Sequence, residues 1–334
     1  MRPFVPFFRN PHALTIAGNY WRRELNDRRF PVEANLYATE PGVQVLVHSQ
    51  RPEGEPVAEL ILVHGLEGSS DAGYARSLAQ AALEAGCAVH RFNMRSCGGT
   101  EHLSGTTLYH SGQTGDLLSV IGQLQARAPL FVVGFSLGGN VALKLAGELG
   151  ESAAALIAGV AAISTPIDLA ACVRELQQPS NFIYSSRFLR RLKERIRRKD
   201  QATPGLFRLD QLDRVKTIYD FDDRFTAPSF GFGTADNYYA TQSSNQFLER
   251  IRIPALLVHA KDDPLIPFEV YRHPAFERNL RLRLLAVEHG GHLGFIARTK
   301  PRFWLDEVLL DWVLESRAVN AGDGGVSTGA RPAW

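Results

Sequence analysis

A serine stands between two glycines in the stretch VVGFSLGGN, where Ser136 lies between Gly134 and Gly138. An apolar, strand-like run precedes this serine, and a helical pattern follows it. Gly-x-Ser-x-Gly at a strand-to-helix turn is typical of a nucleophile elbow, in which a tight turn lifts the serine hydroxyl clear and the glycines avoid steric clashes. A plain turn of small residues would give the same five letters, so the pattern needs partners elsewhere in the chain.

The first partner is a base, because a neutral serine is a weak nucleophile at pH 7. In sites of this kind the chain order is serine, acid, histidine, so the base must follow the segment ALLVHA and its acid. That order leaves His273, His289 and His292. His273 is close to the acid in sequence and precedes a proline, so we discount it. We favour His292 in the glycine-rich loop VEHGGHLGF, and His289 is then a supporting residue or a plain polar residue of the loop.

The acid that orients the base is expected in HAKDDPLIP, which offers Asp262 and Asp263. Neighbouring side chains of an extended segment point in opposite directions, so only one carboxylate can face His292. The Asp-x-x-Ile-Pro frame favours Asp263, which would hold the imidazole in the correct tautomer. Asp262 is then expected to be a turn or capping residue.

Two backbone amides are needed to stabilise the oxyanion of a tetrahedral intermediate. The amide of Leu137, directly after the serine, is the first candidate. The second is the amide of Leu66 in the loop HGLEGSS, which follows the apolar run LILV. The same loop also offers capping residues for the next helix, and the two interpretations are compatible.

The elements that must position these residues alternate between strand and helix over 43–149. Strand-like runs such as AELILVHG, CAVHRFN and LFVVGF alternate with helical stretches such as DAGYARSLAQAALEAG. Such alternation predicts βαβ units around a mostly parallel sheet flanked by helices. AAALIAGVAAIST is the next expected strand, although its alanine-rich start also fits a helix.

The pattern changes at 166–253, where helical, aromatic and glycine-rich stretches replace strands. We predict a helical cap at 166–253, inserted between core segments 1–165 and 254–317 of one α/β domain. The runs PALLVHA and LRLRLLAVE predict further strands, and FWLDEVLLDWVLESR predicts an amphipathic last helix. The glycine-rich tail 318–334 is expected to be disordered.

Composition excludes several classes of function. The chain of 334 residues has 45% hydrophobic residues and a formal net charge of +2, so nothing indicates a nucleic-acid partner. Cys87, Cys97 and Cys172 cannot all pair and lack the Cys-x-x-Cys spacing of zinc or redox sites, so we expect a reducing compartment, the cytoplasm, and a structural role for Cys97. The longest weakly polar run, AAALIAGVAAI, is far shorter than the roughly 20 residues of a membrane-spanning helix.

Two further features have alternative interpretations. The basic amphipathic stretch Arg187 to Lys199 could lie on an anionic membrane surface, or it could be a cap helix with a solvated outer face, which we favour. Several aromatic residues of the cap could line an acyl pocket or form the core of the cap: Phe221, Phe225, Phe230, Phe232, Tyr238 and Tyr239.

With these motifs together, the chain resembles the α/β-hydrolase fold family. The resemblance rests on GFSLGGN, HGLEGSS, GGHLGF, NPHALTI, NMRSCGGT and NYYATQSSNQFLERIRIPALLVHAKDDP. Within this family, the chain is similar to the branch that contains the bacterial YheT-like proteins and the eukaryotic α/β-hydrolase-domain lipid hydrolases and ethyl-ester acyltransferases. Ser96 stands where this branch tends to have glycine, and Asn237 where an acidic residue or threonine is usual.

The resemblance implies a serine esterase that cleaves carboxylic esters of short to medium acyl chains through an acyl-enzyme on Ser136. It implies no metal and no organic cofactor, and its partner would be a small ester or lipid-like molecule. Acyl transfer to an alcohol at the same site is the alternative. A non-catalytic lipid-binding module is the alternative from another class. We expect no N-terminal membrane anchor of the kind that the eukaryotic members carry.

Overall fold

The computed structural model describes residues 3–322, and their strands form one eight-stranded sheet with the order β1-β2-β4-β3-β5-β6-β7-β8. β1 pairs antiparallel with β2 and β2 antiparallel with β4, and all other pairs are parallel. The strands are β1 Glu33–Glu40, β2 Val43–Gln50, β3 Glu59–Val63, β4 Ala88–Phe92, β5 Leu130–Phe135, β6 Gly159–Ile163, β7 Ala255–Ala260 and β8 Leu282–Val287. The predicted mostly parallel sheet flanked by helices is therefore confirmed.

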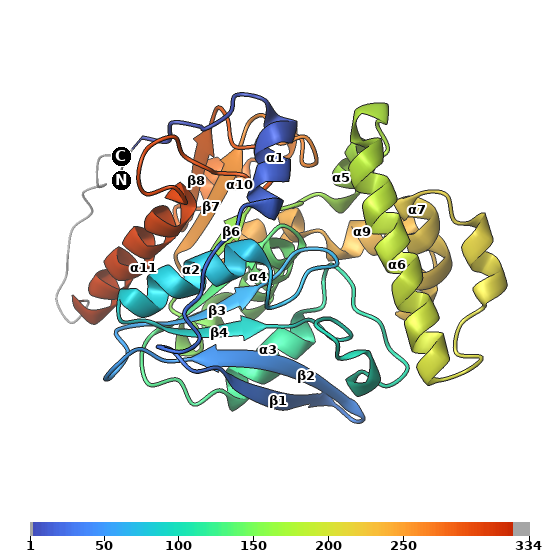
Figure 1. Ribbon diagram of the computed structural model, residues 1–334, viewed down its shortest axis with the longest axis horizontal. Coiled ribbons are helices and arrows are strands. Elements are labelled where there is room, and N and C mark those ends of the chain that lie inside the picture. The colour runs from blue at the N-terminus through green and yellow to red at the C-terminus, as the bar shows by residue number, and fades with distance from the viewer. Residues whose placement is uncertain (1–2, 323–334) are drawn as a thin grey trace.

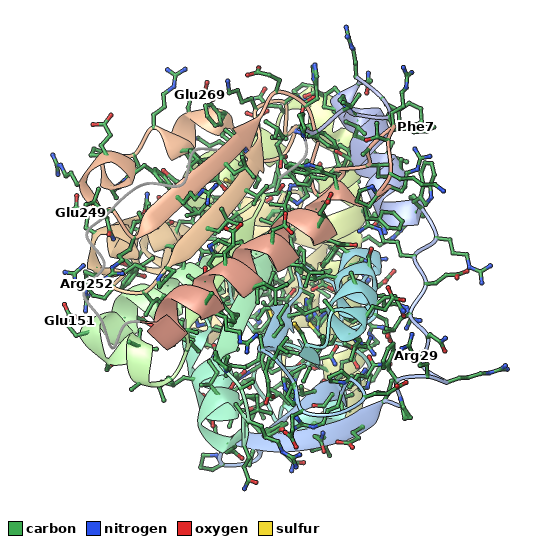
Figure 2. All side chains as sticks on the ribbon, turned by 90° about the vertical axis from the view of Figure 1, so that its left-hand side faces the viewer. Phe7, Arg29, Glu151, Glu249, Arg252 and Glu269 are labelled. Carbon is green, nitrogen blue, oxygen red and sulfur yellow. The ribbon has the colours of Figure 1, made fainter. Side chains whose placement is uncertain are left out.

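Helices cover both faces of the sheet because alternate side chains of a strand point to opposite faces. On β5, Val132 packs in the cluster that includes helices α3 and α4, whereas Val133 packs in the cluster that includes α2 and α11. Figure 2 shows α11 crossing one face of the sheet beside α2. These helices are α2 Gly73–Glu84, α3 Thr114–Gln123, α4 Leu137–Leu149 and α11 Trp304–Gly322.

The segment predicted as a cap lies between β6 and β7, and within it the structure has helices and turns. Figure 1 shows α5, α6, α7 and α9 gathered on the opposite side of the molecule from α11. The helices are α5 Leu169–Leu176, α6 Phe182–Ala202, α7 Ile218–Phe221, α8 Ala227–Ser229 and α9 Ala235–Gln242, with a π-helical turn η5 at Asp222–Thr226. The short helix α10 Ala275–Arg278 follows later, between β7 and β8.

The structure differs from the sequence prediction at four places. Helix α1 at Pro11–Tyr20 and the edge strand β1 were not predicted. Of the stretch AAALIAGVAAIST, only Gly159–Ile163 is a strand, since its start completes the short helical turn Gly150–Ala155. Helix α11 continues to Gly322, five residues into the tail predicted to be disordered, and residues 323–334 lie outside the described part. Across residues 3–322, every helix is too short or too polar to cross a membrane.

Candidate active site

Ser136 occupies the sharp turn between β5 and α4, with φ 51° and ψ −121°. A non-glycine residue rarely adopts this backbone conformation, and it persists only where the surroundings enforce it. The flanking glycines make the turn possible: a Cβ at Gly134 would lie 2.2 Å from the Gly138 carbonyl oxygen, and one at Gly138 would lie 2.3 Å from that of Val63. The amide of Ser136 donates to the carbonyl of Ile163 on the neighbouring strand, at 2.8 Å.

His292 reaches this serine from the loop that follows β8. Its Nε2 lies 3.0 Å from Ser136 Oγ, and its Nδ1 lies 2.9 Å from Asp263 Oδ2. With Nδ1–H donating to the carboxylate, Nε2 is free to accept the serine proton. The structure thus brings together the three side chains that the sequence analysis selected from β5, the end of β7 and the end of β8.

Asp263 is buried and is oriented by the turn that follows β7. Its Oδ1 accepts hydrogen bonds from the amides of Leu265, at 2.9 Å, and Ile266, at 3.1 Å, which leaves Oδ2 for His292. Burial opposes the ionisation of this carboxyl group, but the attraction of His292 and its hydrogen bond outweigh burial and lower the pKa of Asp263. The carboxylate is therefore charged where it meets the imidazole.

The neighbouring Asp262 forms a second pair, with His289. Its Oδ2 lies 3.0 Å from His289 Nδ1, and its Oδ1 accepts from the amide of Gly291 at 2.9 Å. This pair fixes the loop that carries His292 instead of touching Ser136. His273 belongs to neither pair, since its Nδ1 accepts from the amide of Ala275 at the start of α10.

The amides of Leu66 and Leu137 are both available beside Ser136. Leu137 is the first residue of α4, so its amide has no acceptor within the helix, and the positive end of the helix dipole lies there. In the loop after β3, the amides of Gly65, Glu67 and Gly68 donate to Tyr74, Tyr109 and Gly65 respectively. Among the described residues, the Leu66 amide makes no hydrogen bond. A Cβ at Gly65 would lie 3.1 Å from Ser136 Cβ, so this loop packs directly on the serine.

His64 fixes the orientation of the loop. Its Nδ1 donates to the Gly65 carbonyl at 2.8 Å, and its Nε2 accepts from the amide of Met94 at 3.2 Å. Burial lowers the pKa of His64 to about 4, so the ring is neutral and keeps this tautomer near pH 7. The capping role suggested for the same loop is wrong, because helix α2 begins after Ala72 without a side-chain cap.

Helix α1 contacts the histidine loop, a contribution that the sequence analysis missed. The hydroxyl of Thr15 accepts from the amide of His292 at 2.8 Å and donates to the carbonyl of Pro11 at 2.7 Å. The packing is close, since a Cβ at Gly18 would lie 2.8 Å from Gly294 Cα. A lone threonine in a helix carries no sequence signal for this role.

Two hollows meet at Ser136 and His292. The first is a small, mainly apolar cavity of about 100 Å³ between the core and the predicted cap segment 166–253, and the second is a larger, more polar groove of about 800 Å³ between α1, α6 and the loop after β3. Of the six cap aromatics, Phe221, Tyr238 and Tyr239 line the cavity. Phe225 packs in the core of the cap, with Phe230 against it, and Phe232 packs against a second cap cluster, so both interpretations hold for part of the set.

The apolar stripe of the basic helix faces the cap interior. Leu192 and Ile196 are buried in the cap core, and Phe188 lines both hollows. This stripe is therefore not exposed for contact with a lipid surface.

The three cysteines are free and buried, and burial raises the pKa of the Cys97 thiol to about 12. Among the described side chains, no group of three or more His, Cys, Asp or Glu is placed to hold a metal ion.

Comparisons with known proteins agree with the fold. The α/β hydrolase fold family matches residues 59–299. The protein named "Putative esterase YheT" from Escherichia coli is 33% identical over 321 residues, which cover 93% of this chain and 92% of that protein. "Phospholipase ABHD3" from Mus musculus is 29% identical, and the match covers 76% of this chain and 62% of that relative. Among solved structures, the esterase Pf2001 of Pyrococcus furiosus matches with a TM-score of 0.56 and 18% identity over 94% of this chain and 96% of its own, a likeness of fold.

Proposed function

This chain belongs to the α/β hydrolase fold family, and on that premise we propose that it is a carboxylic ester hydrolase that works through an acyl-enzyme on Ser136. The observation that carries the proposal is the hydrogen-bonded series from Ser136 Oγ to His292 Nε2, at 3.0 Å, and from His292 Nδ1 to Asp263 Oδ2, at 2.9 Å. Such a series activates a serine that is otherwise a weak nucleophile.

In the first half of the reaction, Ser136 Oγ attacks the ester carbonyl carbon while His292 Nε2 takes its proton. The electron pair of the carbonyl bond moves to the oxygen, and this oxyanion accepts hydrogen bonds from the amides of Leu66 and Leu137. Each such donor contributes on the order of 100- to 1,000-fold in rate. The bond to the alcohol oxygen then breaks, and His292 gives its proton to the departing alcohol.

In the second half, His292 takes a proton from water as the water attacks the acyl carbon. The second oxyanion rests on the same two amides. When it collapses, Ser136 Oγ leaves and regains its proton from the imidazole, and the free acid departs. Asp263 stays ionised throughout and stabilises the imidazolium that forms in each half.

The two hollows meet beside Ser136, so each would hold one of the two parts of the substrate that the reacting carbonyl carbon joins. We assign the acyl chain to the small apolar cavity, where Leu169, Cys172 and Leu176 supply apolar contacts. We assign the alcohol portion to the wider polar groove, from which water also enters. The small cavity supports short to medium acyl chains, and the relative named as a phospholipase supports ester or lipid-like substrates. The free, buried thiols fit a reducing compartment such as the cytoplasm.

Acyl transfer is the second candidate, because the open groove admits an alcohol as readily as water. Both reactions share the acyl-enzyme, so the products separate them. An ester donor incubated in excess ethanol would give the ethyl ester if transfer competes with hydrolysis, and only the free acid if it does not.

A panel of chromogenic esters of graded acyl length tests the proposed function, with Ser136→Ala as the control. We expect hydrolysis by the wild-type chain, fastest for short and medium chains, and none by the variant. A folded wild-type protein that binds these esters without cleaving any of them would favour the lipid-binding module instead.

A further inference from the structure

Glu67 directly follows Leu66 and has an unusual backbone conformation for a glutamate. The amide of Gly68 donates to the Gly65 carbonyl at 3.0 Å, so residues 65–68 form a β-turn with Glu67 at its third position. Its φ is 55°, in the left-handed region. Glycine is favoured at a turn position with positive φ, because a side chain there is crowded by the backbone. A glutamate at this place therefore needs contacts that compensate for the strain.

Those contacts engage every polar group of Glu67. Its amide donates to the Tyr109 hydroxyl at 3.0 Å, and its carbonyl accepts from Arg191 at 3.2 Å. Its carboxylate accepts from Arg195 through Nε at 2.9 Å and Nη2 at 3.0 Å, and from the Tyr109 hydroxyl at 3.0 Å. Two of these partners, Arg191 and Arg195, lie on helix α6 of the cap.

The ion pair between Glu67 and Arg195 is buried, with exposed side-chain fractions of 3% and 5%. Burying a charged pair is costly unless both charges are fully hydrogen-bonded, so such a pair is weak evidence for a purely stabilising role. Arg195 meets this condition, since it also donates to the carbonyl of Ser96 and its guanidinium lies 5.0 Å from the centre of the Tyr109 ring. The pair ties the cap to one turn of the core, and that turn contains Leu66.

The conformation of this turn determines where the Leu66 amide points. The Gly65 carbonyl and the Leu66 N–H belong to one trans peptide, so they point in opposite directions. His64 and Gly68 both donate to the Gly65 carbonyl, and the Leu66 N–H therefore points away from these two donors. If Glu67 relaxed to negative φ, the Leu66–Glu67 peptide would flip and its N–H would leave Tyr109, so the turn would change type and Leu66 would lose the fixed peptide on its C-terminal side.

We propose that Glu67 and Arg195 are a positioning pair through which the cap helix α6 holds the Leu66 amide in place for the oxyanion. This inference rests on the proposed function. It makes the cap a part of the machinery that stabilises the transition state, in addition to its role as a wall of the substrate cavity. Arg195 lines both hollows and Glu67 lines the wider one, but neither side chain touches the reacting atoms in this scheme, and both act through the turn.

Three substitutions separate positioning from general stability. Glu67→Gln removes the charge and keeps the size, Arg195→Met removes the guanidinium, and Arg195→Lys keeps a charge but cannot form the two-point contact. We expect Glu67→Gln and Arg195→Met to lower kcat about tenfold or more, while KM changes by about twofold or less. This loss of kcat is smaller than the roughly 100- to 1,000-fold cost of removing a whole oxyanion donor, because the Leu66 amide is displaced and not removed. Arg195→Lys should give an intermediate kcat.

A fourth variant, Glu67→Gly, guards against failure to fold. Glycine tolerates the positive φ, so this variant keeps the turn without strain. Its unfolding temperature should fall because the buried charge of Arg195 loses its partner, but the variant should still fold and have a lowered kcat. Two controls complete the set. Arg190→Ala removes an exposed arginine of the same helix, and Val215→Ala weakens the cap core at a residue outside both hollows.

The measurement is kcat and KM on a chromogenic ester, with the thermal unfolding midpoint of each variant. A drop in kcat for Glu67→Gly and Glu67→Gln, with both controls near wild type, supports the positioning pair. Wild-type kcat in folded Glu67→Gly, with Ser136→Ala inactive, overturns the pair and leaves the esterase intact. A kcat loss in Val215→Ala equal to that in Glu67→Gln also overturns it, because cap stability would then explain both. A folded wild-type chain without esterase activity overturns the pair together with the proposed function.

Discussion

The amide of His292 donates a hydrogen bond to the hydroxyl of Thr15, 277 residues earlier in the chain, at 2.8 Å. The N-terminal helix α1 thereby fixes the backbone of the residue whose imidazole faces Ser136. The next residue, Leu293, has φ 57°, in the left-handed region. A helix outside the sheet domain's βαβ pattern thus helps to position the proposed base.

Replacing Thr15 with valine keeps the shape of the side chain and removes the acceptor for the His292 amide. The unfolding free energy should fall by about 1 kcal/mol for the lost hydrogen bond, and kcat should fall several-fold as the loop loosens. Thr241→Val is a matched control, because Thr241 also donates to a carbonyl four residues earlier but lies on the exposed side of α9. Thermal unfolding and ester hydrolysis measure both effects, and equal kcat values in the two variants would contradict the role of Thr15.

The two neighbouring aspartates should respond differently to replacement by asparagine. Asp263→Asn removes the charge that supports the imidazolium and permits the wrong tautomer, so kcat should fall by about 1,000- to 10,000-fold. Asp262→Asn weakens only the contacts to His289 and Gly291, so we expect a loss of roughly tenfold or less from a less rigid loop. Steady-state kinetics of both variants decide, and equal losses would refute the assignment of Asp263.

Gly138 and Gly122 give a matched pair of glycine-to-alanine substitutions. A methyl group at Gly138 would collide with the backbone carbonyls of Val63 and His64, so Gly138→Ala should cost on the order of 3 kcal/mol and abolish the turn at Ser136. Gly122 lies in α3 with open space around it, so Gly122→Ala should stabilise the protein by roughly 0.5–1 kcal/mol. Denaturant unfolding curves report both signs. If Gly138→Ala unfolded at the wild-type midpoint and kept its activity, the close packing of the elbow would be contradicted.

Much of the core could be predicted because its signals are local. The buried strand β5, the glycine-flanked Ser136 and helix α4 follow each other in sequence, and the hydrophobic runs of β3 and β7 are nearly continuous. The order of the motifs left three candidate histidines, and the glycine-rich loop favoured His292 among them. Opposite side-chain directions limited the acid to one of two aspartates, and the Asp-x-x-Ile-Pro frame favoured Asp263. These selections rest on short segments whose geometry is nearly fixed by residue type.

The remaining elements could not be predicted because they depend on contacts between distant segments. Strand β1 is half exposed and mostly polar, so its alternation is weak. The role of Thr15 follows from packing on a loop near the other end of the chain. The strained backbone of Glu67 has no signal in the letters HGLEGSS, and only the structure places the arginines of α6 beside it. Once the turn is known, a glutamate at a position that favours glycine indicates that other contacts compensate for the strained backbone.

The half-buried carboxyl group of Asp222 should make stability depend on pH in an unusual direction. Burial raises the pKa of Asp222 to about 6, against the hydrogen bonds from Tyr239 and Thr226. Between about pH 4 and pH 6 the unfolded chain has lost this proton and the folded chain still holds it, so the contribution of Asp222 to stability falls as pH rises and is lost above about pH 6.

Asp222→Asn removes this dependence. The stability of the variant relative to wild type should therefore increase from pH 4 to pH 6 and then level off, by on the order of 2–3 kcal/mol in total. Chemical unfolding of both proteins across pH 4–8 measures the difference. A difference that stays constant, or that shrinks as pH rises, would show that the group ionises as readily in the folded protein as in the unfolded one.

Intact-mass analysis after reaction with a fluorophosphonate probe tests the central claim most directly. A serine activated by His292 should gain one phosphonyl group, and peptide mapping should place it on Ser136. We expect Ser136→Ala to remain unlabelled and His292→Ala to react at least 100-fold more slowly. A folded wild-type protein without an adduct, or an equal adduct on Ser136→Ala, would contradict the proposed nucleophile.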